Sequence, residues 1–286
     1  MGRRLSAFIG VAFLTMLAFA AAAVHAPGIT GRRNNATEGQ RNAFFPAYDR
    51  LRERLEAARL DALVMVSAEH FTNFFMDNMP AFCFGLAESY PGPHEDEPFL
   101  KIAKTRVPGA ARLARALATA VSEDVDFAHS EELELDHGFM VPLHLLTPRM
   151  NVPIVPIVVN CLAAPRPALK RCYALGRSLR RAVDARPERI GLLACGGLSH
   201  WPAVPESGKL NVEWDRAFLE DFLAHRRDAL TRYSEEEIER DAGPGGHEIR
   251  AWIVVSAATE GACGETLCFE PIPAYAITGC IATMAV

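Results

Sequence analysis

Short apolar runs alternate with helical patterns along most of the chain. Residues 61–67 (DALVMVS), 152–160 (VPIVPIVVN) and 190–195 (IGLLAC) are short and apolar, as expected for strands buried on both faces of a sheet. A further strand is expected at 126–129, and helical patterns cover residues 40–60, 108–121, 139–146, 168–183, 214–230 and 249–258. Ser234 and Glu237 have capping-box spacing for one more short helix. This alternation predicts an α/β fold: a single domain with a central, mostly parallel or mixed sheet flanked by helices.

The N-terminus admits more than one interpretation. Arg3 and Arg4 precede an uncharged run over residues 5–26 that is similar to a secretory signal or a membrane anchor. Cleavage after Ala23, however, would leave His25 almost at the new terminus, without a strand to position it. We therefore expect residues 1–15 to be an N-terminal hydrophobic extension, either a mis-assigned start before Met16 or a signal-like segment. Residues 16–286 then form the domain, which begins with a core strand at 17–24, and a cytoplasmic location is favoured while export stays open.

Composition narrows the classes of partner. The 286 residues are 50% hydrophobic and 23% charged, which suits a globular protein with a full core. A formal net charge of -5 without an extended basic run argues against nucleic-acid binding. The seven cysteines are odd in number and have no C-x-x-C spacing, so reduced thiols are a better interpretation than a disulfide framework or a zinc site.

Several histidines follow predicted strands, where an α/β sheet gathers its ligands. His25 follows the first strand, His70 follows the second, and His200 comes after residues 190–195 through a Gly-Gly-Leu-Ser segment. His137 lies in an Asp-His-Gly segment. Each of these alone is more often a structural histidine than a ligand. Their shared placement favours a functional site.

Glu248 is the candidate carboxylate. It follows three glycines, which allow close approach of the chain to a ligand, and it opens an apolar helix. The alternative is a first-turn carboxylate that complements the helix dipole. Two imidazoles and one carboxylate on one face of a cation are typical of oxygen-using non-haem Fe(II) sites. The spacing alone does not establish that these residues converge.

Six motifs, in this order, carry a resemblance to a known family. They are residues 25–29 (HAPGI), 69–75 (EHFTNFF) continuing into 79–83 (MPAFC), 135–139 (LDHGF), 196–200 (GGLSH), 211–215 (NVEWD) and 247–249 (HEI) with Trp252. Together, over about residues 17–282, they resemble the class III extradiol ring-cleaving dioxygenases, the type of the protocatechuate 4,5-dioxygenase catalytic subunit and of 2,3-dihydroxyphenylpropionate 1,2-dioxygenase.

The resemblance implies that residues 16–286 are an extradiol dioxygenase catalytic domain. It implies Fe(II) bound by His25, His70 and Glu248, with His200 as an acid-base residue beside the substrate hydroxyl and His137 lining the pocket. The implied reaction is extradiol cleavage of a catechol-type aromatic diol with O2 to a ring-opened semialdehyde or related acid. A homo-oligomer or a small companion subunit is expected, and a membrane partner is not.

Some features leave alternatives open. Relatives often have serine before the first ligand, where this chain has Val24, and that difference could alter the hydrogen bonding of His25. Arg32 and Arg33 could meet a substrate carboxylate, but a solvated basic pair is the preferred interpretation. Five phenylalanines could wall an aromatic pocket, although core packing is expected for most of them: Phe71, Phe74, Phe75, Phe82 and Phe84.

Two other functional classes compete with the dioxygenase. One is a non-catalytic metal- or ligand-binding protein on the same scaffold, which the presence of both His137 and His200 disfavours. The other is a zinc-dependent hydrolase, because the ligand types alone do not exclude zinc.

Overall fold

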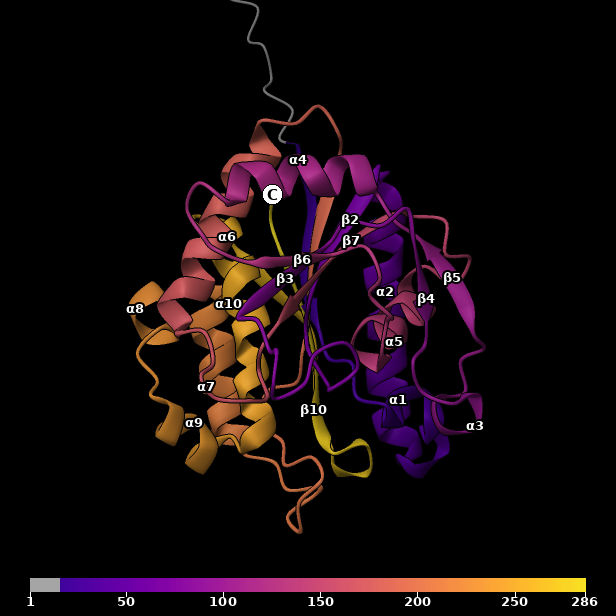
Figure 1. The fold of residues 1–286 in the computed structure, drawn as a ribbon. Coiled ribbons are helices and arrows are strands. Elements are labelled where there is room, and N and C mark those ends of the chain that lie inside the picture. The colour runs from indigo at the N-terminus through magenta and orange to yellow at the C-terminus, as the bar shows by residue number, and fades with distance from the viewer. Residues whose placement is uncertain (1–15) are drawn as a thin grey trace, which may run out of the picture.

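A mixed eight-stranded β-sheet runs through the centre of the molecule, and helices cover both of its faces (Figure 1). The computed structural model describes residues 16–286. In spatial order the strands are β6 (Ala128–Ser130), β3 (Phe82–Gly85), β7 (Ile154–Val159), β2 (Ala62–Ala68), β8 (Ile190–Cys195), β1 (Leu17–Ala23), β10 (Ile277–Met284) and β9 (Gly264–Ile272). The sheet with its flanking helices confirms the predicted single α/β domain.

Four neighbouring strands in the middle of the sheet are parallel. β2 pairs in parallel with both β7 and β8, and β8 pairs in parallel with β1. Antiparallel pairs flank this group, because β10 joins β1 on one side and β3 joins β7 on the other. The carboxyl ends of β7, β2, β8 and β1 therefore meet at one edge of the sheet.

Strand β1 lies inside the sheet, between β8 and β10. Its residues are buried except Ala18, which is partly exposed, and Ala21, Ala22 and Ala23 are completely inaccessible. Helices α2 and α10 contact β1 from opposite sides, and the small alanine side chains leave room for that close packing (Figure 1). The prediction that the apolar stretch before His25 is a core strand is confirmed, whereas residues 1–15 lie outside the described part of the chain.

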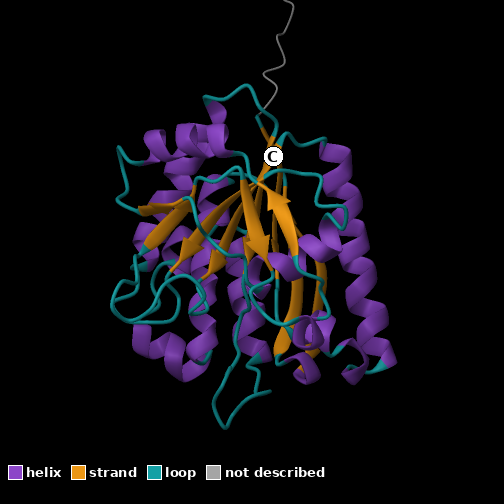
Figure 2. Cartoon of the chain, turned by 45° about the vertical axis from the view of Figure 1, so that its right-hand side comes forward, coloured by secondary structure: helices purple, strands orange, loops and turns teal. Residues whose placement is uncertain are grey.

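The helices form a layer on each side of the sheet, as Figure 2 shows from a second direction. Helices α6, α7 and α10 pack on one face, and α2 and α5 pack on the other. Their bounds are α1 (Gly28–Gly31), α2 (Glu38–Ala58), α3 (Glu97–Leu100), α4 (Ala111–Val121), α5 (His137–Leu146), α6 (Leu169–Asp184), α7 (Val212–Leu223), α8 (Arg227–Leu230), α9 (Glu235–Asp241) and α10 (Ile249–Ala258). Single turns of 3-10 helix occur at η1 (Arg33–Asn35), η2 (Pro244–Glu248) and η3 (Pro273–Tyr275).

Local signals explain where several helices begin and end. Ser234 and Glu237 form the predicted capping box at the start of α9. The helix predicted over 214–230 is wrong in one respect, because it is split into α7 and α8. His225 has φ of 51°, and its Nδ1 is 3.1 Å from the carbonyl oxygen of Ser256, so the chain leaves the helix there.

Some strands were not anticipated. No long apolar run predicts β3, β9 or the separate hairpin of β4 (Ser89–Gly92) and β5 (Thr105–Pro108). Phe82 and Phe84 belong to β3 and are fully buried, which confirms core packing for both.

Two further features concern helix length and the cysteines. Within residues 16–286, no helix combines the length and the apolar character needed to cross a membrane. All seven cysteines are free thiols, and six of them are buried, in agreement with the expectation of reduced cysteines.

Candidate metal centre

The carboxyl edge of the parallel strands brings three of the predicted histidines together. His25 follows β1 by two residues and His70 follows β2 by two residues. His200 lies at the end of the glycine-containing loop that leaves β8. Because β1, β8 and β2 are adjacent and parallel, these loops open on the same side of the sheet.

The carboxylate of Glu248 lies among these three imidazoles. Its Oε2 is 3.3 Å from His25 Nε2, and its Oε1 is 3.5 Å from His70 Nε2 and 3.4 Å from His200 Nε2. Glu248 ends η2 and leads into α10, and its side chain is buried. The adjacent His247 takes no part, since its ring contacts Arg250 and Glu239 instead.

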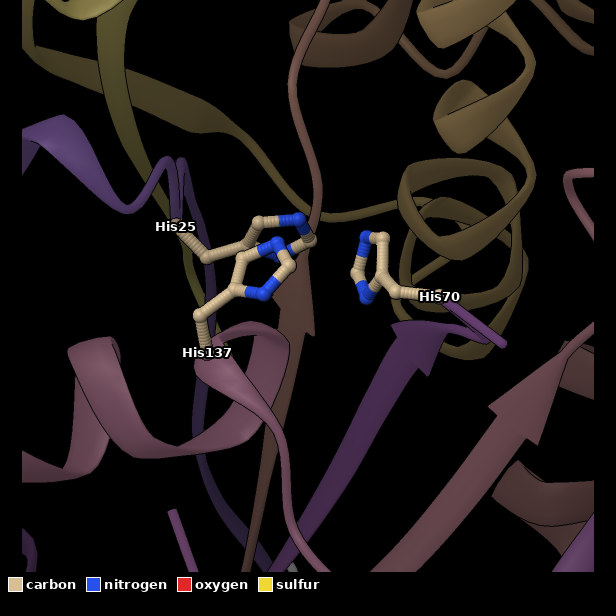
Figure 3. A group of neighbouring side chains, drawn as sticks. All are labelled: His25, His70 and His137. Atoms are coloured by element: carbon tan, nitrogen blue, oxygen red, sulfur yellow. The ribbon is translucent and has the colours of Figure 1, made fainter. Parts of the chain in front are cut away.

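His137 completes the cluster from the first turn of α5. Figure 3 shows the rings of His25, His70 and His137 converging from three separate elements. The ring centroid of His137 is 4.1 Å from that of His70 and 5.4 Å from that of His25. One nitrogen from each of the three rings lies within 4.8 Å of the others, so they form a three-imidazole group able to hold a metal ion. The predicted site residues are thus all brought together.

Buried carboxylates behind the cluster orient two of its histidines. His70 Nδ1 is 2.8 Å from Asp136 Oδ2, and the other oxygen of Asp136 accepts a hydrogen bond from the Gly138 amide at the start of α5. His137 Nδ1 is 2.5 Å from Glu95 Oε1. Such partners fix the ring of a ligating histidine and leave Nε2 free to face the metal. Neither carboxylate was given a role from the sequence, although the N-cap position of Asp136 was a signal for it.

His25 has no such partner. Its Nδ1 is buried without a hydrogen bond to any group in residues 16–286. The preceding residue is Val24, whose side chain offers no polar atom and whose carbonyl oxygen accepts from Tyr48 Oη at 2.5 Å. Val24 therefore offers no side-chain partner to this histidine.

Burial and neighbouring charges shift the pKa values of the cluster residues in different directions. Burial lowers the pKa of His25, which favours the neutral imidazole that metal ions require. Burial opposes ionisation of Glu248, but His25 and His200 outweigh it and hold the pKa of Glu248 well below its usual range. Burial is likewise outweighed at His70, where Asp136 and Glu248 raise the pKa well above the ordinary histidine value. His70 Nε2 has no hydrogen-bond partner among the described residues, so it is available to a ligand.

Glycines make room for the ring of His200. A Cβ atom on Gly245 would lie 2.3 Å from His200 Nε2, and one on Gly197 would lie 2.7 Å from His200 Cε1. Both contacts are shorter than side chains tolerate, so only glycine fits on either side of this ring. The Gly197 amide also donates to Glu248 Oε2 at 2.5 Å, which links the loop after β8 to η2.

Asp215, the last residue of the 211–215 motif, supports the same loop from behind. It is fully buried and accepts hydrogen bonds from the Ser199 amide at 2.6 Å and from the Thr278 hydroxyl. Burial raises the pKa of Asp215 to about 6, while those hydrogen bonds and the nearby His200 act in the opposite direction. No role was assigned to Asp215 from the sequence.

The raised pKa of Asp215 predicts a pH-dependent contribution to stability. Because the folded state holds this proton more tightly than the unfolded chain, the contribution is full below about pH 4 and is lost as pH rises through 6. The free energy of unfolding of wild type should therefore fall by roughly 3 kcal/mol at most, relative to Asp215→Asn, between these limits. Urea unfolding of both proteins from pH 4 to 7 measures this difference, and a constant difference would refute the assignment.

A cavity of about 390 Å³ opens onto the cluster. His25, His70, His137, His200 and Glu248 all line it. The donor set of imidazole nitrogens and one carboxylate, with an unpartnered buried nitrogen on His70 among the described residues, fits a divalent transition metal. The site is therefore consistent with a metal ion beside a pocket for a small organic molecule.

Comparison with known proteins identifies the family. Residues 19–281 match the family described as the catalytic LigB subunit of aromatic ring-opening dioxygenase. The chain belongs to this LigB family. The match covers nearly the whole described chain, including every motif that carried the resemblance.

Curated relatives agree with the family. The LigB-family chain is 30% identical over 251 residues to 2,3-dihydroxyphenylpropionate/2,3-dihydroxicinnamic acid 1,2-dioxygenase of Cupriavidus necator, covering 72% of this chain and 78% of the relative. It is 31% identical over 254 residues to the protein of the same name from Burkholderia vietnamiensis, with the same two coverages. The match to the Klebsiella pneumoniae protein of that name extends over 273 residues at 29% identity, covering 78% and 85%.

A solved structure supports the fold alone. An uncharacterized protein from Escherichia coli K12 superposes with a TM-score of 0.64 at 17% identity, covering 93% of this chain and 99% of that one.

Family and relatives together confirm the expectation of an extradiol dioxygenase that opens a catechol-type ring. They favour an enzyme over the non-catalytic binding protein and the zinc hydrolase.

Proposed function

We propose that this LigB-family enzyme binds Fe(II) through His25, His70 and Glu248 and uses O2 to cleave a catechol-type diol beside its hydroxyl groups. The product would be a ring-opened semialdehyde or a related acid. The observation that carries the proposal is the position of one carboxylate 3.3 Å from His25 Nε2 and 3.5 Å from His70 Nε2, at the floor of a cavity large enough for an aromatic ring.

The third ligand requires a choice between Glu248 and His137, because the three imidazoles also form a group close enough for a metal. Glu248 is favoured for two reasons. It contacts both other candidate ligands through separate oxygens, and its low pKa keeps it ionised. A carboxylate also offsets part of the charge of a divalent cation in a buried site, which an imidazole does not. His137 is then left to face the substrate.

His25, His70 and Glu248 would hold the ferrous ion, and the chemistry that the ion would supply is a binding position for the two diol oxygens and a path for electrons from the ring to O2. The chain's own contribution is to manage protons around that centre. His200 Nδ1 is 2.9 Å from the Leu198 carbonyl oxygen, which can only accept, so Nδ1 carries a proton. In neutral His200 the Nε2 atom therefore has a free lone pair that faces the pocket. It can take the proton from a substrate hydroxyl.

His137 is held in a comparable way. The Glu95 carboxylate accepts from His137 Nδ1, which leaves Nε2 directed into the cluster. This atom can donate to or accept from an oxygen of the substrate. Its position beside His70 and His25 suits the proposed role in lining the pocket near the reacting ring.

Oxygen uptake tests the proposed function. The protein would be loaded with Fe(II) under anaerobic conditions, freed of excess metal, and mixed with catechol, protocatechuate, gallate and 2,3-dihydroxyphenylpropionate in aerated buffer. We expect uptake with at least one diol, accompanied by a ring-opened product, and no uptake by zinc-loaded protein. Zero uptake across a broad diol panel by protein shown to hold Fe(II) would exclude the proposal.

We further propose a cytoplasmic enzyme that works as a homo-oligomer or with a small companion subunit. Removal of residues up to Ala23 would delete β1 from the interior of the sheet, which argues against export by cleavage there. The exposed Phe71, Phe75 and Met76 lie in the loop that follows β2, beside the pocket mouth, and apolar groups of this kind are common where subunits meet.

A further inference from the structure

Apart from the metal cluster, the wall of the pocket is apolar. Its side chains are mostly hydrocarbon and come from several separate segments of the chain: Pro27, Phe71, Leu162, Pro202, Pro244 and Ile277. A catechol bound through its hydroxyls would place its ring and any ring substituent against this surface. Contact with such a wall favours hydrocarbon, because burial of apolar area is the main source of affinity there.

Within residues 16–286, no lysine or arginine side chain lines this pocket. Its ionisable lining residues are His25, His70, His137, Cys161, His200, Glu248 and Tyr275. Tyr275 Oη is already engaged with the Arg33 carbonyl oxygen at 2.5 Å. Burial raises the pKa of the Cys161 thiol, so this side chain stays neutral.

The nearby basic residues are directed elsewhere. The guanidinium carbon of Arg33 lies 3.7 Å from the ring centroid of Phe45, on α2. Lys209 Nζ lies 4.4 Å from the ring centroid of Trp201, and neither Lys209 nor Arg33 lines the pocket. The proposal that Arg32 or Arg33 meets a substrate carboxylate is therefore not supported by their positions.

Carboxylates near the pocket also disfavour a negatively charged substrate. Asp136 and Glu95 stand behind His70 and His137, with Asp136 Oδ2 2.8 Å from His70 Nδ1 and Glu95 Oε1 2.5 Å from His137 Nδ1. A further carboxylate on the substrate would meet apolar carbon on one side and these acidic groups behind the histidines on the other. Burying an unpaired charge in such surroundings is costly.

From this lining we infer that the physiological substrate is a catechol whose ring substituent is uncharged and apolar, such as an alkyl or aryl group. The inference rests on the proposed function of the site. It separates this chain from the curated relatives, whose name specifies a substrate that ends in a carboxylate. The pocket would select by hydrocarbon contact rather than by an ion pair.

Phe71 is the residue that we expect to set this specificity. It lines the pocket, is 42% exposed, and has φ of 58°, an uncommon backbone conformation for a residue other than glycine. Its ring stacks on that of Phe75, with centroids 6.4 Å apart and planes 12° from parallel. Phe71 is thus placed to cover a substituent that extends outward from the ring.

A matched pair of substrates tests the inference. 3-Propylcatechol and 2,3-dihydroxyphenylpropionate carry side chains of the same length, and only the second is charged. With Fe(II)-loaded enzyme we expect kcat/KM to be about tenfold or more higher for 3-propylcatechol, and anaerobic calorimetry should show the same order of affinity. Equal or tighter binding and faster cleavage of the propionate would overturn the inference while leaving the proposed function intact.

The calorimetric arm keeps the two proposals distinguishable. If neither compound is cleaved by protein that holds iron, the proposed function fails for these diols. The ratio of the two dissociation constants still decides whether the pocket prefers an uncharged substituent. If 3-propylcatechol binds no more tightly than 2,3-dihydroxyphenylpropionate, the binding data alone refute the inference.

Variants of two exposed phenylalanines test whether Phe71 provides the preference for an apolar substituent. Phe71→Ala should weaken binding of 3-propylcatechol by about three- to tenfold while changing that of unsubstituted catechol much less. Phe99→Ala is the matched control, because Phe99 is 56% exposed and does not line the pocket. Equal losses for both ligands in Phe71→Ala, or the same loss in Phe99→Ala, would contradict the role of Phe71.

Discussion

Glu248→Ala is expected to lose iron while remaining folded. The substitution removes the only carboxylate that contacts both His25 Nε2 and His70 Nε2 among the described residues. Two neutral imidazoles alone hold a divalent ion weakly, so iron content after anaerobic loading and desalting should fall from about one per chain to near zero. Metal analysis of the desalted protein measures the change.

The fold should survive this change because the lost interactions are local. Glu248 accepts one backbone hydrogen bond, from Gly197, and a bond of this kind to a charged group contributes about 1.5–3 kcal/mol. Circular dichroism and thermal unfolding would show whether the variant is intact.

His137→Phe is the matched control for Glu248→Ala. If Glu248 is the third ligand, His137→Phe keeps iron at wild-type stoichiometry. The opposite pattern, with iron retained in Glu248→Ala and lost in His137→Phe, would replace the proposed ligand set by the three-imidazole group.

His200→Ala is expected to retain iron and to slow ring cleavage by about 10²- to 10⁴-fold, the range for loss of a general acid-base group. The reason is the orientation of His200, whose protonated Nδ1 is held by the Leu198 carbonyl oxygen and whose Nε2 faces the pocket. Single-turnover kinetics with iron-loaded protein would measure the effect on the chemical step.

Added imidazole provides a second readout for His200. Alanine leaves a cavity between Gly197 and Gly245, where the native ring fits closely. Imidazole in the buffer should enter that cavity and restore part of the rate. Turnover equal to wild type without imidazole would remove the acid-base role, as would loss of iron from the variant.

The sequence was sufficient for the parts of the site that depend on strand ends. His25, His70 and His200 follow strands whose apolar runs are visible in the sequence, and parallel pairing brings such ends together. Residues 190–195 and 249–258 were located to the residue because the first is apolar throughout, the second is apolar except for Arg250 and Ser256, and polar residues precede both. The resemblance to the LigB family then supplied the position of Glu248.

Other features depend on contacts that are remote in sequence. Glu95 and His137 are 42 residues apart, and only the folded chain shows that they are paired. Strand β3 has four residues, and β9 alternates little, so neither gives a clear periodic signal. The break at His225 is set by a positive φ and a contact with Ser256 from another helix, which a helical pattern does not reveal.

The apolar pocket wall likewise depends on residues that are remote in sequence. Leu162, Pro202 and Ile277 come from segments that are distant in the sequence and have no shared motif. From the sequence, Arg32 and Arg33 could have met a substrate carboxylate because they follow the loop of His25, although a solvated basic pair was the preferred interpretation. The stacking of Arg33 on Phe45 shows that proximity in sequence did not place its charge in the pocket.

A crystal structure of the Fe(II)-loaded protein, with anomalous diffraction measured on both sides of the iron absorption edge, tests the proposed metal centre most directly. We expect one anomalous peak per chain, bounded by His25 Nε2, His70 Nε2 and the carboxylate of Glu248, at the carboxyl edge of β1 and β2. A peak held by His25, His70 and His137 without Glu248, or a peak away from this sheet edge, would contradict the proposed centre.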